Sequence, residues 1–397
     1  MQVSVYLLAM MADNIEHVIS YWMAFQKFHS PALGGFAVVS HWLPFLVLSV
    51  PVGGLTERFD PRRIIQCGMG LFMLASAGWA WFFITDTLQL WHAMLLLTIH
   101  GCAGVLWQGA TQMLLHDVLP ASGLPSGVRL LATARSLGVL VGPAVGGLIM
   151  LTVGPRYGLL VNVLFFLPNL LWLWKAPYGP KFRTTPAPPP RPVRGFGDIV
   201  RTAREVRTSP LLVSMILLAG LASLFVGNSY QAQMPGFAVD LGHGDADVTY
   251  SILLAADAAG ALTAGLLLES RGQLLRLTPR NAIGLAIAWC IALGSFAATK
   301  SYVVALVLLF AAGVCELSFS AMAQALVQLN APADMRGRVI GLFNMAALGM
   351  RAFAGVTVGL GGSAIGIHTS LALSAGTLAV VLLLLAAWLR QRALARA

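Results

Sequence analysis

Charged side chains are scarce in this sequence. Asp, Glu, Lys and Arg make up 10% of its 397 residues, against roughly 25% in soluble domains, whereas 58% of the residues are hydrophobic. This composition excludes an ordinary soluble globular protein. Cysteine is also rare, and the 4 cysteines show neither a disulfide framework nor the close spacing of a metal site. The sequence has no nucleophile-base motif, glycine-rich phosphate loop or HExxH motif, which argues against the alternative of a polytopic membrane enzyme.

Apolar runs of about 20 residues recur along the chain, and each is long enough to cross a hydrocarbon core of about 30 Å. The short loops between them leave no room for a sizeable soluble catalytic domain, so function is expected inside the membrane. We predict twelve transmembrane helices, near residues 3–26, 32–56, 63–85, 89–115, 127–152, 155–175, 209–234, 247–269, 280–299, 302–328, 338–362 and 368–389.

The net charge of +10 is interpreted as a topology signal. Most of the 25 Lys and Arg residues fall in one set of alternate loops and the C-terminus, while only Lys27, Arg156 and Lys300 fall in the opposite loops. Cationic loops are retained in the cytoplasm. We therefore expect a multi-pass protein of the bacterial inner membrane with both termini in the cytoplasm, and no nucleic-acid partner.

The longest polar stretch, residues 177–208, lies near the middle of the chain and is rich in proline. Proline-rich segments act as stiff linkers. Residues 198–207 place apolar and basic side chains on different helical faces, which predicts an amphipathic helix along the inner membrane surface. We predict an N-terminal six-helix bundle at 1–176, a cytoplasmic linker at 177–208 and a C-terminal six-helix bundle at 209–397.

A short pattern repeats across this linker. Gly53 and Glu57 enclose a leucine in the same way as Gly265 and Glu269, and each copy ends a predicted span on the cytoplasmic side. The equal spacing and equal topological position indicate a duplicated six-helix unit.

Two further motifs mark the N-terminal half. The first is the loop that contains Gly53, Glu57, Arg58, Arg62 and Arg63, where both signs of charge stand beside a helix end and can pair with it or with a neighbouring loop. The second lies in the fifth predicted span, where glycines at a spacing of four permit close helix contact and a proline can bend the helix. Its residues are Gly138, Gly142, Pro143, Gly146 and Gly147.

With these motifs the sequence resembles the major facilitator superfamily over essentially its whole length. The charged loop is similar to that family's cytoplasmic loop motif, with Glu57 in place of the usual aspartate, and the span-five motif matches one that the family associates with antiporters. Residues 332–339 are similar to the loop before span eleven in the enterobactin-exporter and macrolide-efflux branch. The span-four arginine of many proton-coupled drug exporters is not evident, and His100 and Gln108 occupy that region.

The resemblance implies an all-α membrane protein with twelve transmembrane helices in two pseudo-symmetric six-helix bundles, the major facilitator fold. It implies a transporter that works by alternating access, with the charged loop as a conformational latch. Two structural alternatives stay open: the loop charges only fix orientation, and the span-five glycines only serve packing.

The first predicted span carries a polar stripe. Asp13, Glu16, His17 and Ser20 follow the i, i+3, i+4, i+7 spacing of one helical face. An ionised residue at the bilayer centre costs about 2.5–3.5 kcal/mol, so these side chains are expected to face an aqueous cavity rather than lipid. Asp13 and Glu16 are candidates for binding a coupling proton, with His17 within reach of Asp13. Solvation of Asp13 near an interface is the alternative.

Other ionisable or polar residues inside predicted spans are functional hypotheses by default. Asp257 and Glu316 are further proton-coupling candidates, and Asp257 has only alanines as sequence neighbours. Arg135 and Arg351 could bind an anionic group or neutralise these carboxylates in structural ion pairs. The substrate-cavity candidates are His17, Ser20, His41, Gln108, Arg135, Asn228, Gln231, Gln324 and Arg351.

We therefore predict a secondary active transporter. The leading hypothesis is a proton-coupled antiporter that exports a small organic amphiphile such as a drug, siderophore or lipid-like molecule, acting as a monomer without a cofactor. One alternative is a divalent-metal exporter, because His and carboxylate side chains suit transition metals. Its ligands would come from Asp13, Glu16, His17 and His41.

Overall fold

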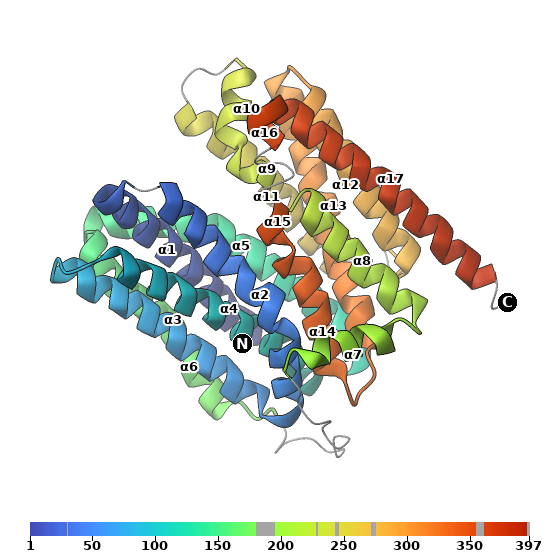
Figure 1. The fold of residues 1–397 in the computed structure, drawn as a ribbon, viewed down its shortest axis with the longest axis horizontal. Helices are drawn as coiled ribbons and strands as arrows, with labels where there is room; N and C mark the ends of the chain where they lie inside the picture. Colours follow the sequence, from blue (N-terminus) through green and yellow to red (C-terminus); the bar gives the residue numbers. More distant parts are fainter. Residues whose placement is uncertain are drawn as a thin grey trace. The chain divides into compact units, whose positions relative to one another are not determined.

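The computed structural model describes residues 1–29, 31–179, 195–227, 229–242, 246–270, 275–354 and 361–394 (Figure 1). Across these ranges the structure is built from helices and contains no strand. In chain order the helices are α1 (Gln2–Phe28), α2 (Pro31–Arg58), α3 (Pro61–Ile84), α4 (Leu90–Val118), α5 (Leu124–Thr152), α6 (Pro155–Lys175), α7 (Gly197–Val206), α8 (Pro210–Phe225), α9 (Ser229–Ala232), α10 (Met234–Asp240), α11 (Ala246–Ser270), α12 (Pro279–Ala298), α13 (Tyr302–Asn330), α14 (Arg336–Asn344), α15 (Arg351–Ala354), α16 (Gly361–Ile365) and α17 (Ile367–Leu394).

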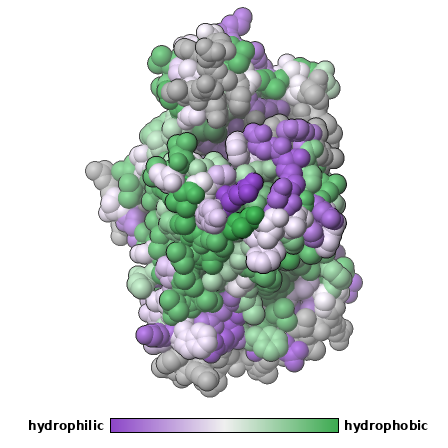
Figure 2. Space-filling view, turned by 90° about the vertical axis from the view of Figure 1, so that its left-hand side faces the viewer, coloured by the Kyte–Doolittle hydropathy of each residue, from purple (hydrophilic) through white to green (hydrophobic). Residues whose placement is uncertain are grey.

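Nine helices among the described residues are long and apolar enough to cross a membrane. They belong to α2–α6, α11–α13 and α17, and the predicted spans one, seven and eleven correspond to α1, α8–α10 and α14–α16. Large apolar side chains on these helices remain exposed, as Leu151, Val303 and Leu384 illustrate. Figure 2 shows apolar residues over much of one face of the molecule, as expected for a protein whose surface meets lipid.

Two of the predicted spans, 209–234 and 338–362, are interrupted in the structure. In the first, α8 ends at Phe225 and Gly227 adopts a left-handed φ of 49°, which only glycine takes readily. In the second, α14 passes into a π-helical turn, Met345–Gly349, before α15 begins. Interruptions of this kind occur in membrane proteins where the backbone is buried in protein or lines a cavity.

The chain divides into two compact units, and each is described by itself. Unit 1 contains Met1–Ser122, Ala134–Val200 and Pro332–Asn344. Within it α3 packs on α4 and α6, α2 packs on α4 and α14, and α1 packs on α6. Its core includes the fully buried rings of Trp79, Trp107, Phe72 and Phe166. These contacts surround the polar face of α1.

Unit 2 contains Gly123–Thr133, Arg201–Ala331 and Met345–Ala397. Here α13 packs on α11 and α12, and α12 packs on α17. Glycines bring α11 and α13 into backbone contact: a Cβ on Gly313 would lie 1.9 Å from the carbonyl oxygen of Asp257. The lack of a side chain at Gly313 therefore allows α11, which carries Asp257, and α13, which carries Glu316, to lie this close together.

The predicted boundaries 1–176, 177–208 and 209–397 stay a prediction. Each compact unit includes a short segment from the other half of the sequence. The amphipathic helix expected at 198–207 is α7, whereas the proline-rich part of the linker, 180–194, lies outside the described residues.

Candidate functional site

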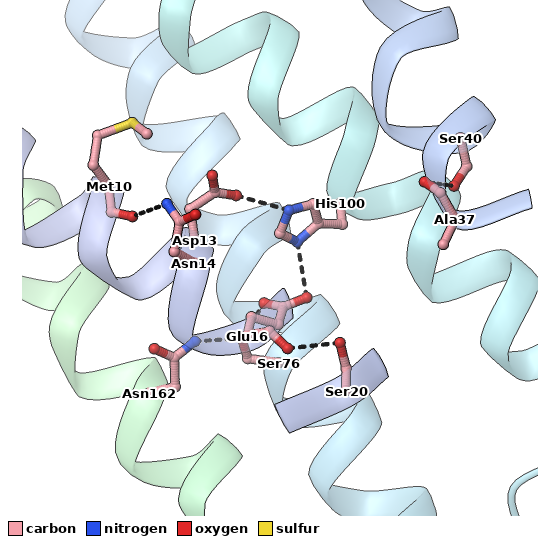
Figure 3. A network of polar contacts seen from close by, with 10 residues as sticks. All are labelled: Met10, Asp13, Asn14, Glu16, Ser20, Ala37, Ser40, Ser76, His100 and Asn162. Carbon is pink, nitrogen blue, oxygen red and sulfur yellow. Dashed lines mark hydrogen bonds and ion pairs between the residues drawn. The ribbon is translucent and has the colours of Figure 1, made fainter. Parts of the chain in front are cut away.

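The polar face of α1 is buried inside unit 1. Asp13, Glu16 and Ser20 are 7%, 1% and 1% exposed. They lie among α3, α4 and α6, and Figure 3 shows the contacts that hold them. The sequence analysis expected these residues to face an aqueous cavity, and this stays a prediction; in the structure Glu16 has polar partners on neighbouring helices.

The main partner of both carboxylates is His100 of α4. Its Nε2 lies 2.8 Å from Asp13 Oδ1, and its Nδ1 lies 2.8 Å from Glu16 Oε1 (Figure 3). The ring also packs edge-on against Phe72, with centroids 4.7 Å apart. An imidazole that meets a carboxylate at each nitrogen can donate to both only when doubly protonated. His100 therefore has the geometry of a cation shared by two acids.

Glu16 has further support from α3 and α6. Ser76 donates a short hydrogen bond to its carboxylate, and Asn162 Nδ2 donates to Ser76 Oγ at 3.2 Å. Ser20 Oγ donates to the backbone oxygen of Glu16 at 2.6 Å. This chain of donors fixes the carboxylate and, through it, the ring of His100.

Two more histidines, His17 of α1 and His41 of α2, lie beside His100. The His17 ring centroid is 4.9 Å from that of His41 and 4.6 Å from that of His100. One nitrogen from each of the three rings lies within 4.8 Å of the other two. Asp13, Glu16, His17, His41 and His100 are together called the histidine cluster below.

A second polar group, the Asp257 cluster, lies in unit 2 and consists of the buried Tyr230 and Asp257 with the half-buried Gln231 and Glu316. Tyr230 Oη lies 3.0 Å from Asp257 Oδ2 and 3.3 Å from Glu316 Oε2. Gln231 Nε2 donates to Asp257 Oδ2 at 3.0 Å. The break between α8 and α10 places Tyr230 and Gln231 on the short helix α9, facing α11 and α13. The sequence analysis named Gln231 but did not predict that the phenol of Tyr230 lies between the two carboxyl groups.

The remaining cavity candidates have different positions. Arg135 of α5 is half-buried and within electrostatic range of His41. Arg351 opens α15, and its Cγ lies 3.8 Å from where a Cβ on Gly227 would stand; its pairing with Glu316 or Asp257 stays a prediction. Gln108 and Gln324 are half-buried, so their cavity role also stays a prediction. Asn228 lies outside the described residues.

The first copy of the repeated motif binds a residue of α14. Glu57 accepts from the backbone N–H of Arg338 at 2.9 Å and makes a short ion pair with its guanidinium group. The same guanidinium lies 3.5 Å from Asp198 of α7. Gly53 permits this approach, because a Cβ there would collide with the backbone of Gly337.

Arg62 serves a different purpose in this loop. It bonds Asp60 and the backbone oxygen of Ala176, at 2.7 and 2.6 Å, so it ties the start of α3 to the end of α6. Arg58 and Arg63 are exposed.

The second copy behaves in the same way inside unit 2. Glu269 lies 3.1 Å from Arg129 of α5 and accepts a short hydrogen bond from Ser126. A Cβ on Gly265 would collide with the side chain of Thr133, whereas one on Gly53 would collide with the backbone of Gly337. The duplicated pattern therefore corresponds to duplicated contacts, each joining a helix-end glutamate to an arginine far away in sequence.

The glycines of the α5 motif pack against α1. A Cβ on Gly138 would lie 2.6 Å from Met10 Cβ, and one on Gly142 would lie 2.7 Å from Asn14 Cβ. Gly146 makes ordinary contacts with α1, Gly147 faces open space, and Pro143 lies within the helix. Three of the four glycines thus have a packing role beside the histidine cluster.

Comparisons with known proteins agree with this architecture. A family model described as Major Facilitator Superfamily matches residues 3–355. The uncharacterized MFS-type transporter YfiS of Bacillus subtilis is 26% identical over 165 residues, 38% of this chain and 38% of that protein's length. The enterobactin exporter EntS of Citrobacter koseri is 26% identical over 319 residues, 75% of this chain and 69% of that protein.

Solved structures show the same fold at low identity. The Escherichia coli fucose:proton symporter FucP superposes with a TM-score of 0.73 at 15% identity, covering 98% of this chain and 97% of that one. The human organic anion transporter TETRAN gives a TM-score of 0.71 at 16% identity, covering 96% and 98%. The all-α membrane fold expected from the sequence is confirmed.

Proposed function

The chain belongs to the Major Facilitator Superfamily, and from this premise we propose that it is a proton-coupled antiporter that exports a small organic amphiphile. The family makes it a multi-pass membrane transporter of small molecules. Our proposal adds a bacterial inner-membrane location, cytoplasmic termini, a monomeric state and two six-helix halves that alternate access to a central site. The observation that carries the coupling is the pair of carboxyl groups facing one phenol in the Asp257 cluster.

The Asp257 cluster has the chemistry of a site for one proton. A phenol has a single hydrogen, so Asp257 and Glu316 compete for the donor of Tyr230. Two like charges in a buried site repel each other, and a proton on either carboxyl group removes that repulsion. Proton binding thereby changes the free energy of the state that holds the carboxyl groups together, which is the requirement for coupling to a conformational change.

The two glutamate–arginine contacts supply a latch in this proposal. Glu57 with Arg338 and Glu269 with Arg129 each join the cytoplasmic end of one predicted span to a segment from the other half of the sequence. Opening toward the cytoplasm would separate both pairs. Asp13 and Glu16, the other two coupling candidates, are engaged by His100, and we assign them to holding that ring.

The substrate class and the direction rest on the relatives. The exporter EntS, named for the export of enterobactin, matches 75% of this chain. This favours export and an organic substrate over the sugar symport named for FucP.

The test uses purified protein in liposomes with an imposed pH gradient and a panel of a catecholate siderophore, a cationic dye and a lysolipid. The wild-type protein should move at least one of these compounds against its gradient. Asp257→Asn and Glu316→Gln should each abolish gradient-driven flux. Asp240→Asn is the matched control, because Asp240 lies in the same unit with a side chain 54% exposed. Unchanged flux in both cluster variants would show that the proton is carried elsewhere.

A further inference from the structure

Three imidazole rings from three helices meet at one point in unit 1, where His100 is buried and the other two are half-buried. His17, His41 and His100 come from α1, α2 and α4, and one nitrogen of each lies within 4.8 Å of the other two. The rings contact one another edge-on or tilted, and no hydrogen bond between them is formed. The Nδ1 atom of His41 is buried and has no hydrogen-bond partner within the described residues. A buried nitrogen left without a partner costs free energy.

We propose that His17, His41, His100 and Asp13 form a binding site for one divalent first-row transition-metal ion. A metal ion offers several nitrogen lone pairs a common partner, which the packed rings do not offer each other. Three imidazoles with one carboxylate are typical ligands for Zn²⁺, Co²⁺, Ni²⁺ or Fe²⁺, whereas Mg²⁺ and Ca²⁺ prefer sites built from oxygen.

The distances are close to those that coordination requires. Metal–nitrogen bonds of about 2.0–2.1 Å in a tetrahedron place ligand atoms roughly 3.3 Å apart. The outermost pair of ring nitrogens, up to 4.8 Å apart, would have to approach by roughly 1.5 Å, which rotation of the side chains supplies. Asp13 Oδ1 lies 2.8 Å from His100 Nε2, so this carboxylate is next to one of the three rings and would have to turn toward the other two.

Glu16 completes the arrangement as a positioning residue. Metal-bound histidines usually donate their other ring N–H to a carboxylate, which fixes the orientation of the ring. Glu16 Oε1 takes this position at 2.8 Å from His100 Nδ1, and Ser76 holds Glu16 in place. His100 would exchange its contact with Asp13 for the metal and keep its contact with Glu16.

The electrostatic balance also favours a cation. Asp13 and Glu16 contribute two negative charges when ionised, while Arg135 is the cation in electrostatic range of His41. Loss of the proton that His100 shares with the two carboxylates leaves this balance negative, so a metal ion would take the place of that proton. This inference goes beyond the proposed function and does not depend on which solute the protein transports.

The experiment uses the full chain in detergent, with any polyhistidine tag removed, and titrates it with Co²⁺. One Co²⁺ per chain should bind, with the visible absorption of a four- or five-coordinate nitrogen and oxygen site, and Zn²⁺ but not Mg²⁺ should displace it. His41→Ala should remove the absorption. Glu16→Gln should weaken the affinity by about 10–100-fold, as the loss of an orienting carboxylate does.

His92→Ala is the matched control, because His92 stands at the start of α4 outside the cluster; its titration should equal that of the wild type. Metal-free thermal unfolding curves of every variant establish that it is folded. Two outcomes overturn the proposal: wild-type protein that gives no cobalt absorption, and a His41→Ala protein that binds Co²⁺ as tightly as the wild type.

Discussion

Replacing Arg338 by methionine tests whether the proposed latch is a buried charge network. Arg338, Glu57 and Asp198 have side chains only 4%, 6% and 1% exposed. Arg338→Met keeps the volume roughly constant but leaves two buried carboxylates without this cation. Removing one partner from a buried ion pair costs about 3–5 kcal/mol. We expect the free energy of unfolding in detergent to fall by an amount in that range.

A double-mutant cycle separates the lost charge from the lost packing. Glu57→Gln in the Arg338→Met background removes one of the stranded charges, so the double variant should recover part of the loss, with a coupling energy of about 0.5–3 kcal/mol. Arg338→Lys should rescue less than the full stability, because a lysine lacks the planar fork with which the arginine reaches both Glu57 and Asp198.

The control for this cycle is Arg58→Met. Arg58 belongs to the same loop motif but is exposed, so its replacement should change stability by no more than about 0.5 kcal/mol. Denaturant unfolding followed by tryptophan fluorescence measures all variants. If Arg338→Met loses less than Arg58→Met, or if the cycle shows no coupling, the latch is not held by these charges.

Two further variants follow from the same structure. Gly142→Ala would place a Cβ 2.7 Å from Asn14 Cβ and should cost about 1–3 kcal/mol in the free energy of unfolding, while Gly147→Ala, which meets open space, should be neutral or stabilising; equal effects would contradict the packing role. Glu269→Gln should cost less than about 1 kcal/mol, because the Arg129 and Glu269 side chains are 19% and 32% exposed, and a loss as large as that of Arg338→Met would contradict this estimate.

Structural features that depend on helical period and on composition could be predicted from the sequence. The stripe of Asp13, Glu16 and Ser20 could be recognised because residues three and four apart share a face, and the structure buries all three. The repeated glycine and glutamate motif predicted paired structural positions, and both copies contact an arginine.

Partners across helices could not be predicted in this way. The sequence suggested His17 as the partner of Asp13, whereas the ion pairs with Asp13 and Glu16 are made by His100, far away in the chain. Helical period says which face a residue occupies but not which helix lies opposite. A histidine in the middle of the apolar helix α4 was the available signal, because a buried polar side chain requires a partner.

The breaks in spans seven and eleven escaped prediction for a related reason. Hydropathy averages over a window and does not register a single left-handed residue such as Gly227 or a π-helical turn at Met345–Gly349. The first of these breaks turns Tyr230 toward Asp257. If α8 continued without a break, its helical period would place Tyr230 in a different direction. The residue that joins the two acids is therefore placed by an irregularity of the backbone, and the proposed coupling chemistry depends on the glycine that permits it.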